Sequence, residues 1–219
     1  MINTSLVDHI YDLEKEKIVN MELGFGQKID LKQKSKEYEV SITPIMQVFN
    51  RLIADGLVTK ELRKGYFIRK ISIKELEELY DVRKIIEIES LKQFTEVDRK
   101  KLDELLSKAN SLLKNNQEMN HKSSKRYIHF EKQFHQFIVQ NSNNQTLFNL
   151  YDSIFPKIQI SQNIGCIRNE EMKEHIKIIN NLLASDFKKA IENLDTHIEN
   201  CKQKAVIALE KYYSNSNTI

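Results

Sequence analysis

The sequence predicts a mostly α-helical protein in two parts: three helices with a small β-hairpin in residues 1–71, then an all-helical bundle in residues 72–219. The 219 residues include only five Gly and two Pro, which favours long helices joined by short connections. Apolar residues recur at helical spacing along most of the chain. Only residues 57–62 and 66–70 are β-rich, and the basic turn Arg63-Lys64-Gly65 lies between them.

Composition narrows the class of protein. Charged residues make up 30% of the chain, but the net charge is only +3. No apolar run reaches the roughly 18 residues that cross a bilayer, and the acidic N-terminus does not look like an export signal. Cys166 and Cys201 lack the spacing of a paired redox or zinc motif, so we expect reduced thiols. These features predict a cytoplasmic protein that does not bind membranes.

The first part is predicted to begin with two helices. Residues from Leu6 to about Met21 carry apolar side chains at helical spacing. Gly24 and Gly26 interrupt this pattern. Asp30 then provides an N-cap for a short second helix that runs to about Tyr38.

A third helix follows, and the first part is organised around it. Thr43 is the expected N-cap with Pro44 as the first helical residue, and Ser41 is the alternative cap. Gly56 ends the helix. A short capped helix followed by a β-hairpin has the shape of a winged helix-turn-helix, although an ordinary amphipathic helix shows the same stripe. The apolar stripe consists of Ile45, Val48, Phe49, Leu52 and Ile53, and the other face carries Met46, Gln47, Asn50, Arg51 and Ala54.

Positive charge is concentrated in the same region. Residues 32–70 contain nine basic and four acidic residues, whereas residues 72–219 contain 22 basic and 21 acidic residues. A local basic segment on a nearly neutral chain is typical of phosphate contact by one part of the protein. A solvated charged face would give the same count.

A run of motifs without gaps extends over residues 18–71. Its members are Glu22-Leu23, Gly26, Ile29, Val40-Ser41, Thr43-Pro44-Ile45, Asp55-Gly56-Leu57-Val58 and Arg63-Lys64-Gly65-Tyr66-Phe67-Ile68. This run resembles the DNA-binding domain of the GntR family of bacterial transcriptional regulators. The resemblance implies a homodimer that binds double-stranded DNA at a roughly palindromic operator. The family usually has DNA-contacting arginines where this chain has Ile42 and Met46.

Without those arginines, other side chains must recognise the DNA bases. Gln47 and Asn50 can pair with adenine edges, and Ser41 and Thr43 can bind phosphate. We therefore predict an A·T-rich operator with few guanine contacts. The other candidate DNA contacts are Lys34, Lys36 and Arg51 near the helices, and Lys64 and Gly65 in the hairpin.

The second part is predicted to contain six helices. The polar segment 115–125 is expected to contain a loop, and Pro156 is expected as a kink or break in its helix. The helical stripes span residues 72–94, 102–113, 127–138, 147–164, 172–183 and 187–205.

Three of these stripes place a histidine among apolar residues. His135, His175 and His197 lie on different predicted helices, and Glu131 precedes His135 by one turn and points the same way. A lone buried histidine is more often a core residue than a ligand. Three imidazoles and a carboxylate from bundle helices are nevertheless suitable ligands for Zn, Ni or Mn. His129 is expected at the surface.

A second set of motifs runs through the helical part of the chain. Its members are Tyr80-Asp81-Val82-Arg83, Glu87, Phe134-His135, Asn144, Leu147, Glu174-His175, Asp186, Ala190 and His197. This set resembles the FCD ligand-binding domain of the FadR subgroup. That subgroup typically binds a metal through Asp-x-x-x-His and two later histidines, and the metal helps to hold a small carboxylate effector. Here Glu131 stands at the Asp position. Arg83 is a candidate for effector binding, and its alternative role is a helix-surface salt bridge with Glu87.

The sequence thus predicts a ligand-responsive transcriptional repressor that senses a small organic acid through a metal. One alternative is a metal-dependent hydrolase, but the chain has neither the HExxH nor the HxxEH spacing. The other alternative is a DNA-binding protein that has lost effector sensing, suggested by Glu131 and by the missing arginines.

Overall fold

A computed structural model describes residues 5–114, 121–165 and 168–216. The chain divides into two compact units, residues 1–72 and 73–219. Among the described residues, no helix has the length and apolarity needed to cross a membrane.

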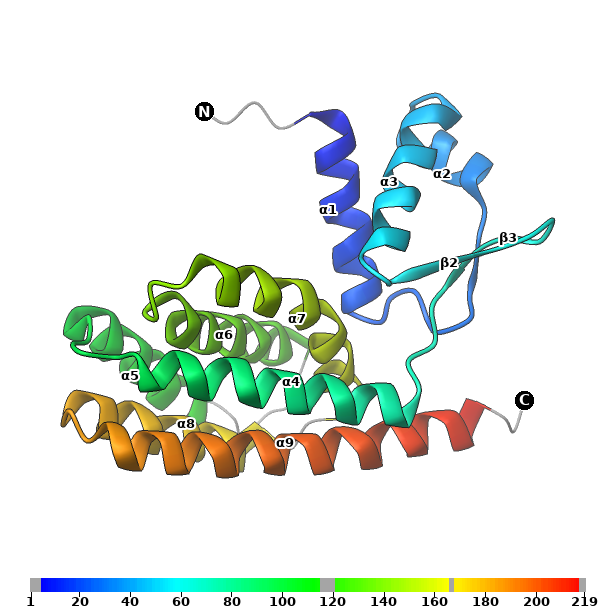
Figure 1. Cartoon of the computed structure of the whole chain (residues 1–219). Helices are drawn as coiled ribbons and strands as arrows, with labels where there is room; N and C mark the ends of the chain where they lie inside the picture. The colour runs from blue at the N-terminus through cyan, green and yellow to red at the C-terminus, as the bar shows by residue number, and fades with distance from the viewer. Residues whose placement is uncertain (1–4, 115–120, 166–167, 217–219) are drawn as a thin grey trace. The chain divides into compact units, whose positions relative to one another are not determined.

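Unit 1 contains three helices and a small sheet (Figure 1). Its strands are antiparallel in the order β1-β3-β2. Ile45, Val48, Phe49 and Leu52 of the predicted apolar stripe are buried in α3, whereas Ile53 is half-buried. Phe49 packs edge-on against Tyr66 of β3. In chain order the elements are α1 (Leu6–Val19), β1 (Lys28–Ile29), α2 (Leu31–Glu37), α3 (Ile42–Ala54), β2 (Val58–Glu61) and β3 (Gly65–Ile68).

Two details of unit 1 differ from the sequence predictions. The N-cap of α3 is Ser41, and the expected Thr43 cap is wrong. Pro44 is still tolerated because it lies within the first turn, where backbone N–H groups have no intrahelical acceptor. Strand β1 was not predicted, since two residues are too short to show a period; Lys28 and Ile29 pair with Phe67 and Tyr66 of β3.

Polar contacts join α1 to α3 at two places. Asp8 pairs with Arg51, whose Nη1 lies 2.6 Å from Asp8 Oδ1. Near the end of α3, the Tyr11 hydroxyl donates to Asp55, and Lys15 Nζ lies 3.5 Å from the same carboxylate. Both contacts lie at the C-terminal end of α3, and they fix that end of the helix against α1.

A buried carboxylate joins α1 to α2. Glu14 is completely buried. Its Oε1 accepts hydrogen bonds from Lys34 (2.8 Å), Lys17 (3.0 Å) and the Tyr38 hydroxyl (2.5 Å). The three helices of unit 1 are thus tied together by ion pairs as well as by apolar packing.

Unit 2 is a helical bundle (Figure 1). Helix α9 packs along α4 and also against α7 and α8, and α6 contacts α4, α5 and α7. Pro156 lies inside α7, as the sequence allowed. The helices are α4 (Ile73–Lys92), α5 (Arg99–Lys114), α6 (His121–Gln140), α7 (Gln145–Gly165), α8 (Arg168–Leu183) and α9 (Phe187–Ser216).

Within the polar segment 115–125, which was expected to contain a loop, residues 121–125 are helical. Helix α6 already begins at His121, because residues 121–125 contain no Gly or Pro to stop a helix. Residues 115–120 lie outside the described residues. Cys201 is a buried thiol, and Cys166 lies outside the described residues.

Candidate functional site

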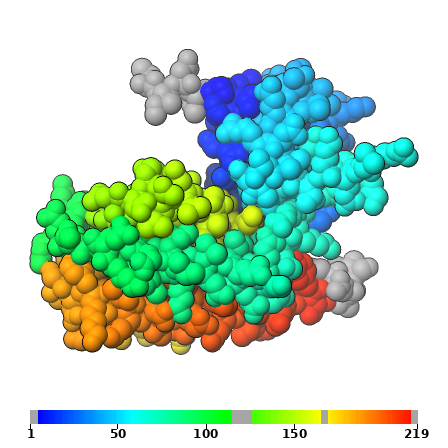
Figure 2. Space-filling model, in the orientation of Figure 1, coloured from blue at the N-terminus to red at the C-terminus, as the bar shows by residue number. Residues whose placement is uncertain are grey.

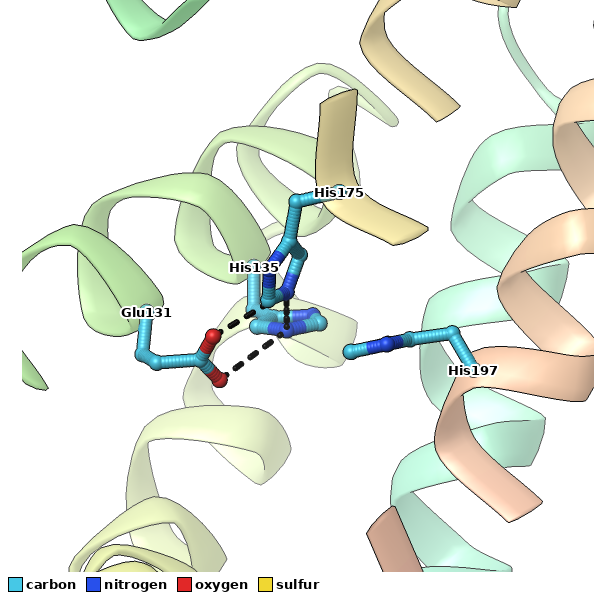
Figure 3. A group of neighbouring side chains, drawn as sticks. All are labelled: Glu131, His135, His175 and His197. Carbon is cyan, nitrogen blue, oxygen red and sulfur yellow. Dashed lines mark hydrogen bonds and ion pairs between the residues drawn. The ribbon is translucent and has the colours of Figure 1, made fainter. Parts of the chain in front are cut away.

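Four potential metal ligands converge in the core of unit 2. Glu131 and His135 extend from α6, His175 from α8 and His197 from α9 (Figure 3). Each offers one ligand atom, and these atoms all lie within 4.8 Å of one another. All four side chains are buried. The helical spacing of Glu131 and His135 does bring them to one side of α6, as predicted.

The distances within this cluster fit a shared ion. The Nε2 atoms of His135 and His175 are 3.2 Å apart. Glu131 Oε1 lies 3.1 Å from His175 Nε2, and Glu131 Oε2 lies 3.6 Å from His135 Nε2. Two donor atoms bound to one zinc ion at about 2.1 Å are roughly 3.4 Å apart at the tetrahedral angle.

Outer carboxylates orient two of the imidazoles. His135 Nδ1 lies 2.6 Å from Glu87 Oε2, and His197 Nδ1 lies 2.7 Å from Glu174 Oε2. Because each Nδ1 faces a carboxylate, the Nε2 lone pair is left for the cluster. Gln162 of α7 donates to Glu131 Oε2 at 3.0 Å.

The protonation states also suit metal binding. Burial would raise the pKa of Glu131, but the adjoining imidazoles of His175 and His135 lower it overall, below the usual range of a glutamate. Burial lowers the pKa of His175 well below its ordinary value and also lowers the pKa of His197. An ionised carboxylate and neutral imidazoles are the forms that coordinate metal.

Arg83 lies next to this cluster, linked through one carboxylate. It is completely buried, and its Nε donates to Glu87 Oε1 at 2.7 Å while the other oxygen of Glu87 faces His135. The alternative surface salt bridge is therefore corrected: the pair with Glu87 exists, but it lies in the core. Nη1 and Nη2 of Arg83 are buried and have no hydrogen-bond partner among the residues that the structure describes. Such donors are costly unless a ligand or water satisfies them.

Several contacts of the cluster residues could not be predicted from the sequence. Glu174 contacts His197, 23 positions away, and Gln162 contacts Glu131, 31 positions away. No local sequence pattern predicts contacts over such separations. Glu87 carried a signal, since it follows Arg83 by one helical turn. Its contact with His135 spans 48 positions and is visible only in the folded chain.

The candidate DNA contacts lie in unit 1. Ser41, Thr43, Gln47 and Asn50 are exposed on or beside α3. Within the described part of the chain, the side chains of Gln47 and Asn50 form no hydrogen bond, so their amide groups are available. Lys36 is exposed as well.

The hairpin projects from the rest of unit 1 (Figure 2). It carries Lys64, whose side chain is 72% exposed and lies 3.0 Å from Glu61. Gly65 adopts φ +109°, a backbone conformation that favours glycine. Leu62 at the same turn is 88% exposed.

Two of the predicted phosphate contacts are already engaged within the protein. Lys34 is held by Glu14 and Glu37, at 2.8 and 3.1 Å. Arg51 pairs with Asp8, and its guanidinium lies 4.0 Å from the centre of the Tyr11 ring. Phosphate would have to compete with these ion pairs, which the sequence alone did not reveal.

Comparisons with known proteins identify both units. Residues 6–68 match the family of bacterial regulatory proteins, gntR family, and residues 78–200 match the FCD domain. The uncharacterised HTH-type transcriptional regulator YdhC of Bacillus subtilis (strain 168) is 26% identical over 192 residues, which cover 85% of each chain.

Solved structures share the fold. A crystal structure of a transcriptional regulator GntR from Rhodococcus sp. RHA1 aligns with TM-score 0.79 and 19% identity, over 93% of this chain and 98% of that one. E. coli McbR/YncC aligns with TM-score 0.72 and 17% identity, over 96% and 99% of the two chains. The resemblance inferred from sequence is confirmed, and the hydrolase alternative falls away: the chain belongs to the gntR family of bacterial regulatory proteins, FadR subfamily, as a DNA-binding transcriptional regulator with a C-terminal FCD domain.

Proposed function

We propose that this protein is a cytoplasmic repressor that binds its operator as a homodimer and responds to a small organic acid held in unit 2. Two copies would place their α3 helices in successive major grooves of a roughly palindromic site. The acid must bind the DNA-competent and the DNA-incompetent states with different affinity, because equal affinity shifts no equilibrium.

The metal in this proposal is divalent and is held by Glu131, His135, His175 and His197. Three imidazoles with one carboxylate suit Zn or Ni better than Mn, which prefers oxygen ligands. The glutamate reaches further than the aspartate usual in the subgroup, and its Oε1 lies only 3.1 Å from His175 Nε2. When bound, the metal supplies a positive centre that attracts an anionic oxygen.

The observation that carries the effector class is the buried guanidinium of Arg83. Within the described ranges of the chain, its two terminal nitrogens have no hydrogen-bond partner, and Glu87 connects it to the metal-ligand candidate His135. A carboxylate matches both features, because it can accept two parallel hydrogen bonds from an arginine. A small organic acid would thus satisfy donors that the protein alone leaves unpaired.

Metal analysis of the purified full-length protein tests this proposal, followed by thermal unfolding with a panel of organic acids. We expect one equivalent of metal per chain and a higher melting temperature with the correct acid. His135→Ala should lose the metal, whereas His129→Ala, an exposed histidine on the same helix, should retain it. Full metal content in His135→Ala would refute the site. An unchanged melting temperature with every acid would favour loss of effector sensing.

A further inference from the structure

Two large apolar side chains are exposed on the N-terminal half of α3. Ile42 is 40% exposed and Met46 is 39% exposed. They are four residues apart, so they lie one above the other on the same flank of the helix. By contrast, the apolar stripe of the helix, from Ile45 to Leu52, is buried.

The chemistry around this pair points to one partner. Thr43, Gln47 and Asn50 are exposed on the same helix, and the segment of residues 32–70 has more than twice as many basic as acidic residues. In helix-turn-helix proteins the N-terminal residues of the reading helix contact base edges in the major groove. An apolar pair in that position therefore meets bases and not protein.

Only one base offers an apolar group in the major groove. Thymine presents its C5 methyl, whereas guanine, cytosine and adenine present hydrogen-bonding groups or a bare ring edge. We propose that Ile42 and Met46 determine operator specificity by packing against thymine methyl groups. This inference rests on α3 being the reading helix. It assigns a readout to the two positions where the family's arginines are missing.

The proposal also explains how neighbouring residues can cooperate. The amides of Gln47 and Asn50 suit the adenine edge, and an apolar side chain suits the thymine opposite it or beside it. The same A·T pair can thus be read on both of its bases. Burying one methyl is worth about a three- to fivefold change in affinity.

The test uses the full-length protein and duplexes selected from a random-sequence pool. Each thymine of the selected half-site is replaced in turn by deoxyuridine, which keeps the base pair and removes only the methyl group. We expect about three- to fivefold weaker binding at one or two thymines per half-site. The double variant Ile42→Ala, Met46→Ala should bind both versions equally. Leu150→Ala, which truncates an exposed apolar residue of unit 2, should behave like the wild type.

A second selection checks the same positions by gain of function. Ile42→Arg with Met46→Arg should return sites with guanine where the wild type selected thymine. Equal affinity of the wild type for thymine and deoxyuridine duplexes would overturn the proposal, as would a selected half-site without thymine. If the protein selected no duplex from the pool, DNA binding itself would be refuted. The failure of this inference can thus be distinguished from the failure of the proposed function.

Discussion

Replacing Glu87 by glutamine tests the link between the buried arginine and the histidine cluster. Glu87 is completely buried and contacts Arg83 Nε at 2.7 Å and His135 Nδ1 at 2.6 Å. Burial would raise the pKa of this carboxyl, but the adjacent His135 imidazole and the Arg83 guanidinium lower it below its ordinary value. The side chain is therefore ionised at neutral pH, and the variant removes a charge that both partners use.

The expected loss of stability is large. Removing one partner of a buried ion pair typically costs about 3–5 kcal/mol, because the other charge is left uncompensated. Glutamine keeps the volume and can still accept one hydrogen bond, so we expect about 3 kcal/mol. Domains are stable by about 5–15 kcal/mol, which leaves the variant folded. Loss of the carboxylate behind a histidine ligand should also weaken metal binding by about 10–100-fold.

The loss of stability is measured by urea unfolding in the presence of a chelator, followed by far-ultraviolet circular dichroism. The loss of metal affinity is measured by metal titration. Glu89→Gln is the matched control, since Glu89 lies on the same helix in an exposed pair with Lys92. Exposed pairs contribute little, so the control should lose less than about 1 kcal/mol. Adding Arg83→Met to Glu87→Gln should recover part of the stability, because the unpaired charge is then absent.

The reasoning fails if Glu87→Gln unfolds at the same urea concentration as Glu89→Gln. It also fails if the double variant is less stable than Glu87→Gln by the full cost of a second independent core substitution. Either result would mean that Arg83 finds compensation elsewhere in unit 2.

Three further predictions concern unit 1, acid–base behaviour and salt. Glu14→Gln should lower the free energy of unfolding by about 1–3 kcal/mol, measured by urea unfolding. This is less than for a fully enclosed ion pair, because its partner Lys34 can turn toward water. An unchanged free energy of unfolding would show that apolar packing alone joins α1 to α2. Burial and the Glu131 charge raise the pKa of Glu171 from 4.5 to about 7, so wild-type stability should fall as pH rises through this window, by up to about 3 kcal/mol. Glu171→Gln should lack that fall, and parallel pH curves for variant and wild type would contradict the assignment. Operator affinity should drop by about 10³–10⁵ between 50 and 200 mM salt if the dimer neutralises roughly six to ten phosphates, and a flat salt dependence in mobility-shift assays would exclude this mode.

The sequence was informative where a helix has one buried face. The stripe from Ile45 to Leu52 predicted the buried side of α3, and the spacing of Glu131 and His135 predicted a shared direction. Those relations are local, because they follow from 3.6 residues per turn. Strand β1 could not be predicted, since its two residues gain their structure from pairing with β3.

Ion pairs between residues far apart in the chain also limited what could be predicted from the sequence. Lys34 and Arg51 look like free cations in the sequence, but each is paired with an acid of α1, 20 and 43 positions away. For Arg83, the partner Glu87 could be predicted from the helical spacing, whereas the burial of Arg83 could not. Charge counts predict that a segment is basic, but tertiary contacts decide which of its cations are available.

The contacts that hold α1 against α2 and α3 have a mechanical consequence. Asp8 and Asp55 form ion pairs that fix the C-terminal end of α3 against α1, and Glu14 fixes α2 against α1 through Lys34. These ion pairs oppose a change in the packing of the three helices within unit 1. In the proposed homodimer, an effector bound to unit 2 would therefore change operator affinity through the distance and angle between the two copies of α3. Operators that differ in half-site spacing would then respond to the effector more strongly than operators that differ in base sequence.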